Sequence, residues 1–144
     1  MKKVLIPFVI VIVLFVGFIV SVHLVNDHTA RTVERKLSEA ALPDNTERLE
    51  SLSKAGKLVG NGNGMQYFGA ILIRSEQSLD ELYAHYVQKI PDAVVKEQTS
   101  QTIECIEHGD LSFKTHISET ENYFIVYLFG NGHYPFSDLD IRGH

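Results

Sequence analysis

The sequence is poor in cysteine and, beyond its first residues, in basic side chains. Cys105 is the only cysteine among 144 residues, so no internal disulfide can form. From residue 26 onward the chain carries 11 basic and 18 acidic side chains, a net charge of −7. Nucleic-acid binding requires a basic face that contacts phosphates, so we expect no nucleic-acid partner.

Recognisable catalytic and cofactor motifs are also missing. No serine lies in a nucleophile-elbow pattern, and no repeat or low-complexity tract divides the chain. Cys105 lies among apolar neighbours, where a buried small side chain is a commoner role than a nucleophile. His108 and His116 are expected on the surface. We therefore expect one small domain, no cofactor and a non-enzymatic role.

The most distinctive feature present is an apolar run near the N-terminus. Val4–Val25 contain no Asp, Glu, Lys or Arg, and as an α-helix these 22 residues span about 33 Å. That length crosses a hydrocarbon core of about 30 Å. Val9–Val16 are apolar on every side of such a helix, as lipid contact requires. The sequence thus predicts one transmembrane helix and a membrane as partner.

A cleaved secretory signal is the alternative interpretation of this run. The basic start Lys2-Lys3 fits both, but a signal peptide has an apolar core of only about 7 to 15 residues and a small-x-small cleavage site. The run instead ends in Ser21-Val22-His23. We expect an uncleaved signal-anchor over residues 1–25.

Basic residues flank the run almost equally, so the positive-inside rule does not settle its orientation. Two precede it and three follow it, namely Lys2, Lys3, Arg31, Arg35 and Lys36. A short leader ahead of a long apolar helix resembles an export signal whose amino end stays in the cytoplasm. We expect a single-pass protein of the cell membrane with its C-terminal part outside.

Residues 26–43 predict a helical stalk. Ala30, Val33 and Leu37 recur at intervals of three and four, and Pro43 disfavours helix in the residue before it. We expect this helix to continue the membrane helix outward. The folded extracytoplasmic domain is expected over residues 44–144.

The next segments predict a hairpin. Residues 48–59 fit a helix or a strand, and we predict a strand, because residues 60–64 read GNGNG and the following MQYFGAILI is rich in aromatic and β-branched residues. Glycine amides could also bind an anion. A P-loop, however, needs a lysine and a following helix, so we interpret residues 60–64 as a hairpin turn.

One helix and the remaining strands complete the predicted fold. Ser78 and Glu81 match a capping box, and an apolar face runs through Leu79, Leu82, Tyr83, Tyr86, Val87 and Ile90 up to Pro91. Residues 93–97 and 102–107 are expected to form one long or broken strand, and further strands are expected over residues 111–118 and 123–129. The fold class is α+β: an N-terminal transmembrane helix followed by a small antiparallel sheet of four or five strands with one packed helix.

The C-terminal tail concentrates ionisable groups. If the tail is extended, Leu139 and Ile141 face the core and four side chains project to the other side. These four are Asp138, Asp140, Arg142 and His144. Arg142 then pairs naturally with Asp140, and we favour an ion-paired outer face.

The same tail offers a conceivable metal or ligand site. Its members would be Asp138, Asp140 and His144, with His133, because carboxylates and imidazoles bind metals. Arg142 lies among them and would repel a cation. We therefore assign no metal, and keep this cluster only as the alternative.

Several short motifs resemble a group of uncharacterised, small membrane-anchored proteins of Gram-positive bacteria. They are Leu-Pro at residues 42–43, the Gly-Asn-Gly loop, Ile-Leu-Ile at 71–73, Ser-Leu-x-Glu-Leu at 78–82, and the closing Asp-Ile-Arg-Gly-His. The resemblance covers residues 42–144. It implies a bacterial membrane or surface setting, and no activity is attached to the group.

Our leading hypothesis is a single-pass membrane protein whose extracytoplasmic domain binds another membrane protein or a cell-envelope component. One alternative is an envelope enzyme or metal-binding module using the C-terminal Asp/His cluster. Another is a structural subunit that caps a larger membrane complex, which predicts an exposed apolar patch on the domain.

Overall fold

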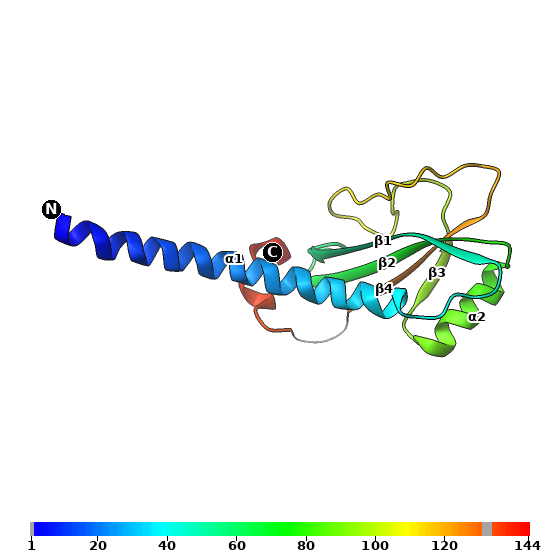
Figure 1. Ribbon diagram of the computed structural model, residues 1–144, viewed down its shortest axis with the longest axis horizontal. Coiled ribbons are helices and arrows are strands. Elements are labelled where there is room, and N and C mark those ends of the chain that lie inside the picture. The colour runs from blue at the N-terminus through cyan, green and yellow to red at the C-terminus, as the bar shows by residue number, and fades with distance from the viewer. Residues whose placement is uncertain (1, 131–133) are drawn as a thin grey trace.

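The computed structural model describes residues 2–130 and 134–144, and the side chains from Ile6 onward within those ranges. It confirms the α+β class: a long N-terminal helix is followed by a four-stranded antiparallel sheet and a second helix. The first half of α1 projects away from the domain, and the C-terminus lies beside α1 where this helix reaches the domain (Figure 1).

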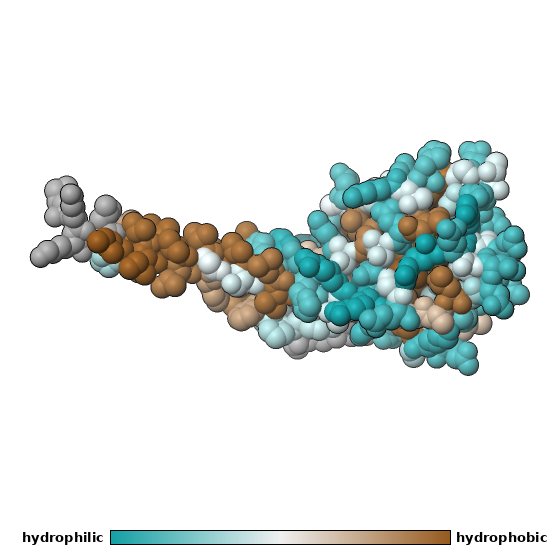
Figure 2. All heavy atoms as spheres, in the orientation of Figure 1, coloured by the Kyte–Doolittle hydropathy of each residue, from teal (hydrophilic) through white to brown (hydrophobic). Residues whose placement is uncertain are grey.

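Helix α1 (Lys2–Ser38) has 37 residues, or about 55 Å at 1.5 Å per residue. Its large apolar side chains from Ile6 to Val20 are exposed on every side of the helix. This half forms the brown projection in Figure 2. Among the described helices, α1 alone is long and apolar enough to span a membrane.

The second half of α1 is part of the folded domain. From residue 22 onward one stripe of the helix is buried, with members spaced by three or four: Val22, Asn26, Ala30, Val33 and Leu37. The helix ends at Ser38, five residues before Pro43, and runs without a break from its exposed half into the core. Residues 26–38 thus pack on the sheet along their whole length.

The sheet has the strand order β1-β2-β4-β3, with every pair antiparallel. Its strands are β1 (Thr46–Gly56), β2 (Gln66–Ser75), β3 (Val94–Glu97) and β4 (Tyr123–Phe129). The predicted hairpin around residues 60–64 is confirmed as β1–β2. Strand β4 is buried on both faces and lies inside the sheet, as its unbroken apolar sequence predicts.

Helix α2 (Leu79–Lys89) and the second half of α1 cover one face of the sheet. The predicted capping box is present, because Ser78 Oγ accepts from Glu81 N and the Glu81 carboxylate accepts from Ser78 N. Tyr86 is buried as expected, whereas Tyr83, predicted to face the core, is half-exposed. The predicted packed helix is thus α2, and the second half of α1 packs on the same face of the sheet beside it.

Gly69 lets α1 approach the sheet closely. It lies in β2 directly beneath the helix, where a Cβ atom would stand only 2.4 Å from the backbone nitrogen of Glu34. Real Cβ atoms do not come so near to backbone, so any larger residue at position 69 would push α1 outward.

The opposite face of the sheet is covered by residues 98–122, the yellow and orange chain in Figure 1. The strands predicted at 102–107 and 111–118 were wrong, since this segment makes only one isolated bridge, Thr102 to Ser112. Ile103 and Phe113 of this segment are buried against the sheet.

A carboxylate in β1 holds this covering segment in place. Glu50 accepts hydrogen bonds from the backbone amides of Lys114 and Thr115, at 2.9 Å each, and from the Thr115 hydroxyl. Partial burial raises the pKa of Glu50, but these hydrogen bonds outweigh it and the net pKa is lowered. Side-chain bonds thus replace the ladder that a strand would have made.

Candidate functional site

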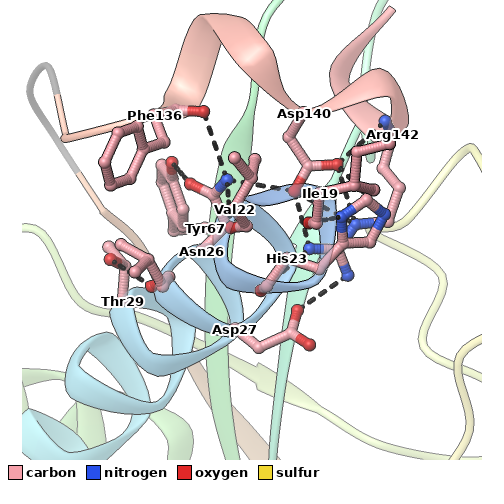
Figure 3. Close-up of polar contacts among 11 residues, drawn as sticks. Ile19, Val22, His23, Asn26, Asp27, Thr29, Tyr67, Phe136, Asp140 and Arg142 are labelled. Carbon is pink, nitrogen blue, oxygen red and sulfur yellow. Dashed lines mark hydrogen bonds and ion pairs between the residues drawn. The ribbon is translucent and has the colours of Figure 1, made fainter. Parts of the chain in front are cut away.

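A polar cluster lies where the exposed half of α1 meets the domain (Figure 3). We call it the junction cluster. It joins α1, β2 and the C-terminal tail, and its members are His23, Asn26, Asp27, Tyr67, Asp140 and Arg142. Asn26 and Asp140 are both fully buried, which makes this the main buried polar contact of the described chain.

Asn26 is the polar member of the buried stripe of α1, so its side chain points at the domain. Its Nδ2 lies within hydrogen-bonding distance of three acceptors: the carbonyls of Val22 and Phe136, at 3.0 and 3.3 Å, and Asp140 Oδ2, at 3.0 Å. Its Oδ1 accepts from the Tyr67 hydroxyl at 2.5 Å. One side chain thus ties α1 to the sheet and to the tail.

Arg142 and Asp140 form a two-pronged ion pair. Arg142 donates from Nε to Asp140 Oδ1 at 3.0 Å and from Nη2 to Asp140 Oδ2 at 2.7 Å. The same guanidinium reaches α1, where Nη1 binds Asp27 Oδ1 at 2.7 Å and Nη2 binds the His23 carbonyl at 3.3 Å. Paired, fork-shaped bonds of this kind fix orientation as well as charge.

Asp140 and Tyr67 each keep one protonation state around neutral pH. Burial raises the pKa of Asp140, but hydrogen bonds and charge from Arg142 more than reverse this and lower it to about 2. Burial, with the nearby Asp140 charge, raises the pKa of Tyr67 to about 12. Near neutral pH the carboxylate stays ionised and the phenol stays protonated. These fixed protonation states suit a stable structural contact better than proton transfer.

The tail folds as two short 3₁₀ turns, η1 (Ser137–Leu139) and η2 (Ile141–Gly143), so the extended conformation that we predicted was wrong. Asp140 starts the second turn and caps it by accepting from the Arg142 amide at 3.1 Å. This turn reverses the expected facing: Asp140 is buried, and Leu139 and Ile141 are exposed. The expected Asp140–Arg142 pair exists, but it lies inside.

The turns are also joined to the β1–β2 hairpin. Lys57 N donates to the Arg142 carbonyl at 2.7 Å, and Gly64 N donates to the Gly143 carbonyl at 2.6 Å. A Cβ on Gly143 would stand 2.9 Å from the backbone nitrogen of Met65, so only glycine fits this contact.

The glycine-rich hairpin loop makes its own internal contacts. The Gly60 amide donates to the Glu107 carboxylate at 2.8 Å, and the His108 imidazole contacts the Gly60 carbonyl at 2.7 Å. An internal carboxylate therefore occupies the amide that an external anion would need. The turn interpretation of residues 60–64 fits the structure.

The metal ligands considered in the tail are not assembled. Asp138 and His144 are exposed, whereas Asp140 is buried against Arg142 and Asn26. Among residues 2–130 and 134–144, no group of three or more His, Cys, Asp or Glu side chains is placed to hold a metal ion. His133 lies outside the described residues.

Cys105 is half-buried beside a cavity of about 190 Å³ under the covering segment. Burial raises the pKa of this thiol, which disfavours the thiolate that a nucleophile requires. Its position agrees with the packing role that we expected. His116 is exposed, and His108 serves the hairpin contact described above.

Sequence reasoning found Asp140 and Arg142 but missed their partners on α1. One signal was available: Asn26 stands four residues before Ala30, so it continues the apolar stripe of the helix as its single polar member. A buried polar residue at such a position needs a partner. Nothing in the sequence points to Tyr67 as that partner.

Comparisons with protein-family models, with curated proteins and with solved structures gave no match to this chain. Its function is therefore argued from the residues described above.

Proposed function

We propose that this chain is a single-pass membrane protein and a non-enzymatic binding module, which holds its domain in a fixed orientation on the outer surface of a bacterial cell. The continuity of α1 carries the proposal. One unbroken helix leads from an all-round apolar half into the core of the domain, so no flexible linker separates the two.

The apolar half of α1 supports the membrane span. Water would meet about 15 consecutive residues of exposed apolar helix, which is costly in solution and favourable in lipid. The basic residues on the two flanks are nearly equal in number and do not set the orientation. The proposal places the amino end in the cytoplasm, as in an export signal, and residues 26–144 outside.

The chemistry of the junction cluster supports binding rather than catalysis. Its carboxylate and its phenol both titrate far from neutral pH, and the Cys105 thiol has a raised pKa. These groups are therefore poorly matched to acid, base or nucleophile roles near neutral pH.

The proposed partner surface lies at the end of the sheet farthest from the junction. There an open groove of about 560 Å³, the distal groove, is formed where β1 starts, β2 ends and β4 starts. Arg74 lines this groove and pairs with Glu47 at 2.5 Å and with Glu121 at 2.6 Å. The junction cluster fixes the domain to α1 at one end, and the polar distal groove lies at the other end. This arrangement suits a polar partner of the cell envelope.

Site-specific photocrosslinking in intact cells tests this function. A photoreactive residue at Glu76, on the rim of the distal groove, should give one discrete crosslinked species, and Arg74→Ala should abolish it. The matched control is an equally exposed site near the junction, Lys54, which should give none. Crosslinking that is absent at Glu76, or equal at both sites, would reject the distal groove as the binding surface.

Topology is tested separately in a Cys105→Ser background. A cysteine in place of Glu76 should react with a membrane-impermeant maleimide on intact cells. Labelling only after the cells are opened would place the domain in the cytoplasm and contradict the proposal.

A further inference from the structure

The two C-terminal turns have inverted polarity. The acidic residue, Asp140, is fully buried, and its two apolar neighbours are among the most exposed residues of the tail: Leu139 is 56% exposed and Ile141 is 76% exposed. No other large apolar side chain that the structure describes is as exposed as Ile141, including those on the projecting half of α1. A turn that faces water would show the opposite arrangement.

The tail is fixed at a definite level along α1. The ring of Phe136 packs edge-to-face on Phe18, with ring centroids 6.3 Å apart, and Phe18 belongs to the apolar half of the helix. Arg142 binds Asp27, the first charged residue after that half. The turns therefore lie beside the stretch where α1 changes from apolar to polar. Figure 1 shows the C-terminus next to α1 where this helix reaches the domain.

We infer that the turns lie in the interface of the same bilayer that α1 crosses, with Leu139 and Ile141 inserted among the lipids. The inference rests on the proposed membrane span. It adds a second, independent contact between the domain and the membrane. The contact of Phe136 with Phe18 joins the start of the turns to the apolar half of α1, and in this proposal one lipid phase covers both.

The proposed membrane contact also explains why the junction cluster fixes the tail. A free tail could not keep two apolar side chains at one depth, because the ordering of a chain end is entropically costly. The bonds of Arg142 to α1 and of the tail carbonyls to Lys57 and Gly64 fix the turns rigidly. Domain tilt about the single helix is thereby restricted, since the membrane holds the domain at two points.

Tryptophan fluorescence tests the insertion directly, because the natural chain contains no tryptophan. The full-length variants Ile141→Trp, Leu14→Trp and Tyr83→Trp are each reconstituted into vesicles of plain phosphatidylcholine, or into vesicles with phosphatidylcholine that is brominated either near the top of its acyl chains or deep within them. Leu14 lies in the apolar half of α1, and Tyr83 is a half-exposed aromatic residue on α2, away from the junction.

We expect lipid brominated near the top of its acyl chains to quench the fluorescence of Ile141→Trp by about twofold or more. It should leave Tyr83→Trp unchanged, because a bromine atom quenches only a tryptophan that lies close to it. The emission of Ile141→Trp should also lie at shorter wavelength than that of Tyr83→Trp. Ile141 and Tyr83 are both exposed, so substitution of either side chain leaves the core undisturbed.

Leu14→Trp separates the two proposals. If it is quenched and Ile141→Trp is not, the turns face water or an absent protein partner, and the inference is overturned while the membrane span stands. If Leu14→Trp, which lies near the middle of the apolar run, is unquenched even by lipid brominated deep in its acyl chains, α1 does not cross the bilayer and the proposed function fails together with the inference.

Discussion

The two halves of helix α1 share one backbone conformation but suit different surroundings. From Ile6 to Val20 apolar side chains cover the whole circumference, whereas from Asn26 to Ser38 they form a single buried stripe and the other faces are polar. Length does not distinguish the halves. The distribution of apolar residues around the axis does, and it identifies which half meets lipid and which meets a protein core.

The boundary between the halves lies where polar side chains first enter the stripe. Asn26 occupies a core-facing position, and its hydrogen bonds go to Val22, to the tail and to Tyr67. The predictions below alter one half or the boundary between them. All six tyrosines lie at or beyond Tyr67, so near-UV circular dichroism of the full chain in detergent follows unfolding of the domain alone.

The largest effect is expected from Arg142→Met, at the boundary. This substitution leaves the Asp140 carboxylate buried without its ionic partner, which should lower the free energy of unfolding by about 3–5 kcal/mol. Urea unfolding measures the change. The double variant Asp140→Leu/Arg142→Met removes both charges and should recover part of the loss. Equal losses in the single and double variants would show that the pair does not act through charge.

Leu37→Ala tests the domain half of α1. Leu37 is fully buried in the core, so its truncation should lower the free energy of unfolding by about 2–4 kcal/mol. Val20→Ala is the matched change in the apolar half, where the side chain is exposed, and it should leave domain stability unchanged. Equal changes in the free energy of unfolding for the two variants would contradict the distinction between the halves.

Acid should weaken the boundary. The folded pKa of Asp140, about 2, lies below its unfolded value of about 3.9, so its contribution is complete above the unfolded pKa and is lost as the pH falls through the folded pKa. This contribution is about 2 kcal/mol and should disappear between about pH 5 and pH 1. Urea unfolding at stepped pH measures it, and Asp140→Asn should show a flatter pH dependence than the natural chain. A profile that Asp140→Asn leaves unchanged would contradict the assignment.

The smallest effects compare two buried tyrosines. Tyr67→Phe removes the hydrogen bond to Asn26 and should cost about 1–2 kcal/mol. The Tyr86 hydroxyl is buried and finds no hydrogen-bond partner among the described residues, so Tyr86→Phe should change stability by less than about 0.5 kcal/mol. A larger loss for Tyr86→Phe than for Tyr67→Phe would reverse the account of the boundary.

The elements that sequence predicted well depend on local chemistry. The capping box of Ser78 and Glu81 is complete within four residues, and α2 starts there as expected. The hairpin follows from a glycine-rich turn between two segments with apolar character. Periodicity also revealed the apolar half of α1 and the stripe through Ala30, Val33 and Leu37.

The elements that sequence mispredicted depend on distant partners. Residues 111–118 alternate like a strand, but Glu50, more than 60 residues earlier, binds their backbone and replaces a neighbouring strand. In the tail, alternation predicted that Leu139 and Ile141 face the core. Asn26 and His23, the partners of Asp140 on α1, lie more than 110 residues away in the sequence. They draw the Asp140 carboxylate inward, and Leu139 and Ile141 are exposed instead.

Rigid continuity of α1 from the bilayer into the domain is tested most directly by a distance measurement between spin labels in lipid nanodiscs. One label replaces Val16 in the apolar half and the other replaces Lys54 on β1, in a Cys105→Ser background. The structure predicts a single distance distribution as narrow as that between two labels within the domain, at Lys54 and Tyr83. A broad or divided distribution for the first pair alone would show a hinge between membrane and domain, and would contradict the account.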